Sequence, residues 1–168
     1  MSIQLKTAII SSMTNKILAE IHNQLLCRRQ TIAVAESCSG GLLCAELTKQ
    51  PGSSAYFLLG VVAYSNKSKE KILKIPASLI SKYGAVSRQT AILMAKNIRD
   101  ISKSDAGISI TGIAGPGGAS ADKPIGTVFI CLSIRNINIC RKFSFKGSRN
   151  IIRGKTTQEA LRLLCAHL

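Results

Sequence analysis

A serine, a tyrosine and a lysine in the first half of the chain have side chains suited to amide chemistry. Ser54 lies in the segment GSSA, and Tyr64 and Lys69 follow in the segment YSNKSK. A serine hydroxyl is a weak nucleophile until a base takes its proton. A lysine can be that base where burial or a nearby cation lowers its pKa toward neutrality. The spacing differs from the S-x-x-K of penicillin-recognising enzymes, and on this pattern alone turn serines and a solvated lysine explain the residues better.

Two glycine-containing segments could bind an anion through their backbone N–H groups. Residues 36–41 read ESCSGG and residues 111–118 read TGIAGPGG. Glycines allow the backbone to approach a phosphate or carboxylate closely. Ser39 as a plain helix N-cap explains the first segment equally well. A tight turn explains the second, which is not a P-loop because Gly118-Ala119 stands where Lys-Ser/Thr is needed.

Cysteines and histidines give no support for a metal site. The chain has six cysteines and two histidines, but no C-x-x-C pair, and His22 and His167 lie near opposite ends of the sequence. We interpret the cysteines as reduced thiols, most of them buried as small apolar side chains. Cys38 invites assignment as a thiol nucleophile, but no histidine lies near it in the sequence. No metal and no cofactor are therefore expected.

Length, charge and hydropathy indicate one folded domain over residues 1–168. The composition is 46% hydrophobic and 18% charged, with a formal charge of +15. That charge favours anionic partners, yet the lysines and arginines are scattered and the chain has no Trp for base stacking. The longest uncharged apolar run, residues 55–64, is too short to span a membrane. With no secretory signal visible at the N-terminus, we expect a cytoplasmic protein without a membrane partner. The composition disfavours a nucleic-acid partner, although the basic charge does not exclude one.

Helical and strand patterns alternate along the chain. They predict an α/β fold, a three-layer α/β/α sandwich with a mixed, partly antiparallel sheet. Ligands collect at the carboxyl ends of strands in such sheets, so residues 36–41, 64–69 and 111–118 should share one site. The predicted elements are a helix over 14–29, a strand over 31–35, a helix over 42–49, a strand over 59–64, helices over 67–73, 77–82 and 87–101, a strand over 105–110, a hairpin over 126–145 and a helix from 148.

Seven short motifs in one order give the chain a family resemblance. They are AESCSGG (35–41), GSSA (52–55), YSNKSK (64–69), GAVS (84–87), TGIAGPGG (111–118), KPIGTV (123–128) and GSRNIIR (147–153). Together they closely resemble the CinA C-terminal domain family, from about residue 14 to the end. Stand-alone members of that family are bacterial nicotinamide-nucleotide amidohydrolases. The resemblance implies hydrolysis of the carboxamide of nicotinamide mononucleotide (NMN) to nicotinate mononucleotide and ammonia, without a metal.

The resemblance also implies roles for individual residues. By motif position Ser54 would be the nucleophile, Lys69 the general base and Tyr64 the group that orients or relays the proton. The basic residue suited to the nucleotide phosphate is Arg149. The residues expected to bind substrate are Ser37, Gly40, Gly41, Thr111, Gly112 and Arg149.

Some positions depart from the family pattern, and other functions stay open. Ser39 stands where Thr is usual, Leu58-Leu59 replaces an often charged segment, and Ser148 stands where Asp is common. One alternative is a catalytically inactive nucleotide- or nucleic-acid-binding module of the same fold. Another is an amidase for a related pyridine nucleotide. The family and the apolar 55–64 segment further predict a homo-oligomer.

Overall fold

A five-stranded mixed sheet forms the middle layer of the computed structural model, which describes residues 3–168 and the side chains of residues 12–168. The spatial order of the strands is β2-β1-β3-β4-β5. β1 pairs in parallel with β2 and β3, whereas β4 is antiparallel to β3 and β5. The predicted mixed, partly antiparallel sheet is confirmed. The strands are β1 (Ile32–Glu36), β2 (Phe57–Val62), β3 (Ala106–Gly112), β4 (Thr127–Ile134) and β5 (Ile137–Ser144).

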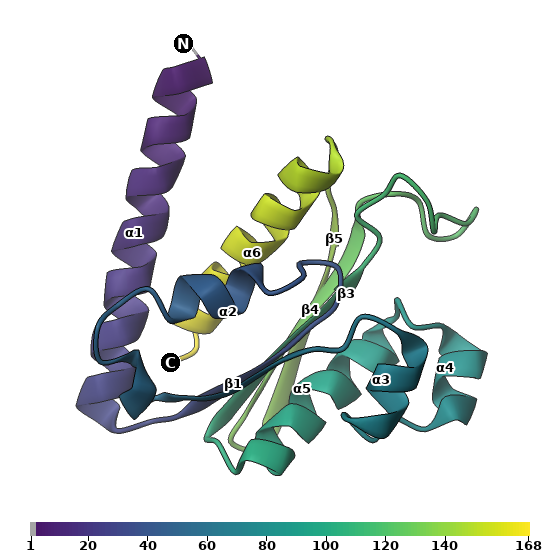
Figure 1. The fold of residues 1–168 in the computed structure, drawn as a ribbon, viewed down its shortest axis with the longest axis horizontal. Helices are drawn as coiled ribbons and strands as arrows, with labels where there is room; N and C mark the ends of the chain where they lie inside the picture. The colour runs from purple at the N-terminus through teal and green to yellow at the C-terminus, as the bar shows by residue number, and fades with distance from the viewer. Residues whose placement is uncertain (1–2) are drawn as a thin grey trace.

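Helices cover both faces of the sheet and complete the predicted three layers. One face packs against α1, α2 and α6, and the other against α3, α4 and α5 (Figure 1). β1 is buried along its whole length, Glu36 included. β4 is buried at all but one position, as its apolar run at residues 128–132 predicts for a strand covered on both sides. The helices are α1 (Ile3–Arg28), α2 (Leu42–Leu47), the 3₁₀ helix η1 (Ser53–Ala55), α3 (Asn66–Lys71), α4 (Ala77–Tyr83), α5 (Arg88–Ser102) and α6 (Arg149–Cys165).

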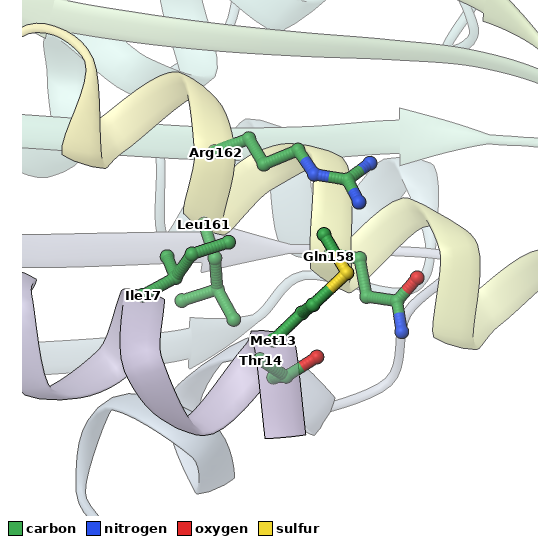
Figure 2. Close-up of a pocket in the computed structure, with 6 residues that line it drawn as sticks. All are labelled: Met13, Thr14, Ile17, Gln158, Leu161 and Arg162. Atoms are coloured by element: carbon green, nitrogen blue, oxygen red, sulfur yellow. The ribbon is translucent and has the colours of Figure 1, made fainter. Parts of the chain in front are cut away.

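The first helix is longer than its sequence pattern suggests. The expected N-terminus was a cap at Thr14, but α1 begins at Ile3 and Thr14 lies inside it. The middle of α1 lies against α6, where Met13, Ile17, Leu161 and Arg162 border a small hollow (Figure 2). Leu161 is fully buried in the core of this face. This contact attaches α1 to the sandwich.

The chain direction of three neighbouring strands sets where a site can form. Because β1, β2 and β3 are parallel, their carboxyl ends lie at the same edge of the sheet. The segments that leave these ends are residues 37–41, 63–66 and 113–118. They are the segments whose polar and glycine residues were expected to meet.

Candidate active site

An open cavity lies at this edge of the sheet. Its volume is about 620 Å³, including space open to solvent, which is in the range of ligand pockets. All three predicted segments contribute to its wall, together with the α4–α5 connection and α6. The lining residues are Ser37, Cys38, Tyr64, Asn66, Lys69, Ala85, Val86, Thr111, Gly112, Ile113, Ala114, Gly115, Gly117, Gly118 and Arg149.

Lys69 extends from α3 to the floor of the cavity and is only 1% exposed. The helix that carries it is short and begins with a capping box, in which Ser65 and Ser68 bond each other's side chains and backbone N–H groups. Lys69 Nζ lies 3.1 Å from Ser37 Oγ, 2.8 Å from the Ala63 carbonyl and 3.3 Å from the Tyr64 carbonyl. Among the described residues it forms no ion pair.

These contacts can be satisfied by either protonation state of Lys69, and burial favours the neutral one. Burial lowers the pKa of Lys69 from its ordinary value, because an ammonium loses hydration in the protein interior. A neutral amine has two N–H donors and one lone pair. In the charged form all three N–H groups of Lys69 are donated, to the two carbonyl oxygens and to Ser37 Oγ. In the neutral form the two carbonyls can keep the two N–H groups, and the lone pair can then accept the Ser37 hydroxyl proton. The geometry is that of a nucleophile beside its general base.

Ser37 is held at the end of β1 by its neighbour Glu36. The Glu36 side chain is fully buried, and its carboxylate accepts N–H groups of Gly41, Leu43 and Cys44 at 2.8–3.2 Å. These are otherwise unpaired donors at the start of α2. The loop therefore turns tightly around the carboxylate, and Ser37 is directed toward Lys69.

Two glycines make this turn possible. Gly40 and Gly41 have φ values of 64° and 95°, a region that residues with a Cβ rarely adopt. The Gly40 N–H donates to the Ser37 carbonyl at 3.1 Å, and Arg153 donates two hydrogen bonds to the Ser39 carbonyl. Gly40 and Gly41 are absent from the cavity lining, so in this structure they shape the loop rather than its wall.

The segment after β3 forms the opposite wall. Thr111 is 1% exposed, and its hydroxyl donates to the Ala85 carbonyl at 2.7 Å, which ties β3 to the α4–α5 connection. A Cβ on Gly112 would lie 2.7 Å from Val128 Cγ2 and 3.0 Å from Cys38 Sγ. Glycine is therefore required there for β3 to pack against the Ser37 loop.

Arg149, at the start of α6, lies at the rim of the cavity. Its Nη1 donates to the Gly115 carbonyl and its Nη2 to the Tyr64 hydroxyl, each at 2.6 Å. The side chain joins the β3–β4 loop to the segment after β2. It therefore places a cation where a negatively charged part of a ligand would enter.

Ser54 is not brought to Lys69, and the predicted pairing of these two residues is corrected. Ser54 is exposed in η1, before β2, whereas Lys69 lies in α3, after β2. The six residues of β2 separate the two edges of the sheet, roughly 20 Å at 3.3 Å per residue. The serine beside Lys69 is Ser37, which was predicted only to line the site.

Cys38 also lines the cavity, but its thiol is unsuited to nucleophilic attack. Burial raises the pKa of Cys38 to about 11, so the thiolate that would act as nucleophile is scarce at neutral pH. Within the described part of the chain, no three His, Cys, Asp or Glu side chains are grouped to hold a metal ion. In that same part, no helix is long and apolar enough to cross a membrane.

Sequence comparison assigns the chain to a family. The family model of the CinA C-terminal domain matches residues 14–168. The chain belongs to this CinA family. A CinA-like protein of Desulfotalea psychrophila is 46% identical over 152 residues, which cover 90% of this chain and 37% of that protein. A CinA-like protein of Geotalea daltonii is 47% identical over 134 residues, covering 80% and 32%.

Solved structures agree with the fold. The competence damage-inducible protein A (ComA) of Klebsiella pneumoniae has a TM-score of 0.88 and 30% identity, covering 92% of this CinA chain and 96% of that chain. The competence/damage inducible protein CihA of Agrobacterium tumefaciens also has a TM-score of 0.88, with 35% identity and coverage of 91% and 94%. By contrast, this chain spans about a third of the length of the two curated relatives.

Proposed function

We propose that this CinA domain is an amidohydrolase that converts NMN to nicotinate mononucleotide and ammonia, with Ser37 as nucleophile and Lys69 as general base. The 3.1 Å contact between Ser37 Oγ and the buried Nζ of Lys69 carries the proposal. It supplies in one place the nucleophile and proton acceptor that amide hydrolysis needs.

The reaction would proceed through an ester on Ser37. Lys69 takes the hydroxyl proton as Oγ attacks the carboxamide carbon, and the carbonyl oxygen becomes an oxyanion. Backbone N–H groups of the loops after β1 and β3 are the donors available to stabilise that charge. Lys69 then gives its proton to the amide nitrogen, the C–N bond breaks and ammonia leaves. A water molecule, deprotonated by Lys69, attacks the ester carbon. The bond to Ser37 Oγ breaks, Lys69 returns the proton to that oxygen, and nicotinate mononucleotide leaves.

Two features of the cavity and one of the substrate support a pyridine mononucleotide. The cavity is large enough for a mononucleotide. Arg149 at its rim forms no ion pair among the described residues, so its charge is available to a phosphate. The pyridinium ring of NMN is already cationic and withdraws electrons from the carboxamide, which makes that carbon more susceptible to attack.

The test is direct measurement of nicotinate mononucleotide by chromatography and of ammonia by a coupled assay. The purified protein should form both in equal amounts from NMN, and Ser37→Ala and Lys69→Met should not. A panel of NMN, nicotinamide riboside, NAD and nicotinamide distinguishes an amidase for a related pyridine nucleotide. Absence of ammonia from every substrate, with salt-sensitive binding of a nucleic acid, would favour the inactive binding module.

A further inference from the structure

A hydrogen bond joins Arg149 to Tyr64 at the rim of the cavity. Arg149 keeps one terminal nitrogen on the Gly115 carbonyl and the other on the Tyr64 hydroxyl. These acceptors are neutral. Tyr64 is 57% exposed, so its ring is held outward by this bond rather than by packing.

The two bonds of Arg149 differ in how easily a ligand could replace them. Gly115 is buried, and its carbonyl belongs to the loop that α6 packs beside. The Tyr64 hydroxyl ends an exposed side chain that can rotate. A phosphate oxygen forms a stronger, charge-assisted bond to a guanidinium than a phenol does. A phosphate arriving at the rim should therefore displace Tyr64 and leave the Gly115 contact in place.

The backbone of Tyr64 lies beside the reacting groups. Its carbonyl oxygen is 3.3 Å from Lys69 Nζ, and its side chain lines the same cavity as Ser37. In this structure the hydroxyl lies at the rim, on Arg149; a rotation about the Cα–Cβ bond would carry it toward the interior of the cavity. In the interior it can form a hydrogen bond to a carboxamide held at Ser37.

We propose that Tyr64 and Arg149 form a latch that makes phosphate binding a condition for fast catalysis. The substrate phosphate takes the place of the Tyr64 hydroxyl on Arg149, and the released hydroxyl turns inward to orient the carboxamide. This inference rests on the proposed amidohydrolase function. It adds that the enzyme selects phosphorylated substrates through kcat as well as through binding, since a substrate without phosphate leaves the latch closed.

Nicotinamide riboside with added inorganic phosphate tests the latch. In the parent protein, kcat for the riboside should be roughly 10- to 100-fold below that for NMN, and inorganic phosphate should raise it. Arg149→Gln and Tyr64→Phe should lose this activation, and their kcat values for NMN and the riboside should converge. Arg162→Gln is the matched control because it removes the same charge from α6, about 20 Å along the helix from Arg149, where it borders α1 (Figure 2).

Tyrosine fluorescence gives a readout that does not depend on turnover. The chain has three tyrosines and no Trp, so tyrosine emission is observed directly. Titration with inorganic phosphate or ribose 5-phosphate should change the emission of the parent and of Arg162→Gln, but not that of Tyr64→Phe or Arg149→Gln.

The outcomes separate the latch from the proposed function. Hydrolysis of NMN without phosphate activation of the riboside and without a fluorescence change would overturn the latch and leave the amidohydrolase intact. An unchanged fluorescence response in Tyr64→Phe would also overturn the latch. If NMN gives no ammonia, the proposed function fails, and the fluorescence titration still decides whether phosphate moves Tyr64.

Discussion

Replacing Ser37 by alanine should abolish NMN hydrolysis. The substitution removes the only hydroxyl in contact with Lys69 Nζ among the described residues and leaves that amine with two carbonyl partners. No second nucleophile is placed to substitute, since the thiol of Cys38 is kept protonated. We expect kcat to fall about 10⁴-fold or more, to the level that binding and oxyanion stabilisation alone sustain. That loss corresponds to about 5.4 kcal/mol of transition-state stabilisation.

Ser54→Ala is the matched control. It removes the same atom from an exposed serine in η1, at the other edge of the sheet. Surface substitutions of this kind change stability by about 0.5 kcal/mol or less, so the rate should stay within about twofold of the parent. Thermal unfolding of both variants separates a catalytic loss from misfolding, because Ser37→Ala loses one hydrogen bond, worth about 1 kcal/mol.

Nicotinate mononucleotide formation at saturating NMN is the deciding measurement. A trapped ester on Ser37, detected by mass spectrometry after acid quenching, would add chemical proof. Turnover of NMN by Ser37→Ala at a rate near that of the parent would exclude Ser37 as the nucleophile. An inactive but correctly folded Ser54→Ala would also contradict the assignment, because a serine remote from Lys69 in this chain would then be required.

Three further predictions concern the buried charges beside Ser37. Because burial lowers the pKa of Lys69, kcat/KM should rise with pH and level off below 10.5, the ordinary lysine value; a plateau reached only at 10.5 would contradict this. Below pH 10.5 the lysine of the unfolded parent takes up a proton more readily than the buried one, so the parent should lose stability as pH falls. Lys69→Met lacks this group, and its free energy of unfolding in urea should therefore rise relative to that of the parent. A difference that stays constant with pH would exclude a perturbed lysine. Glu36→Gln should lower stability by roughly 1.5–3 kcal/mol, since an amide N–H then faces backbone donors. Glu46→Gln loses only an ion pair with the exposed Lys49 and should change stability by less than about 1 kcal/mol; equal unfolding temperatures of the two variants would contradict this.

The layer order and the meeting of the three segments follow from sequence patterns. The apolar run at residues 128–132 in β4 and the alternation in β5 distinguish a covered strand from a half-covered one. Parallel strands bring residues 37, 64 and 111 to one edge. The beginning of α1 could not be predicted in this way. Thr14 has the chemistry of an N-cap, but the preceding residues continue the helix to Ile3, and capping chemistry does not mark a start when helix formers precede it.

The partner of Lys69 was predictable in principle from strand direction. Ser54 precedes β2 and Lys69 follows it, so a parallel β2 places them at opposite edges, whereas Ser37 follows the neighbouring strand. Motif resemblance alone made Ser54 the nucleophile. The fully buried Glu36 was also missed, because a carboxylate in a strand usually indicates an exposed face. Its sequence signal was the start of a helix just after two glycines, where unpaired N–H groups need an acceptor.

Neither of the two histidines is placed to act as the base of the proposed reaction. His22 Nδ1 lies 3.2 Å from the Tyr56 hydroxyl, and His167 Nδ1 lies 3.1 Å from the Leu163 carbonyl. Both contacts belong to the α1 and α6 side of the sandwich, and neither ring lines the cavity. A serine at the cavity can therefore lose its proton only to Lys69 among the described groups that contact it. Burial without a carboxylate partner lowers the pKa of Lys69. Its nitrogen is therefore neutral nearer to physiological pH, where a histidine nitrogen ordinarily titrates.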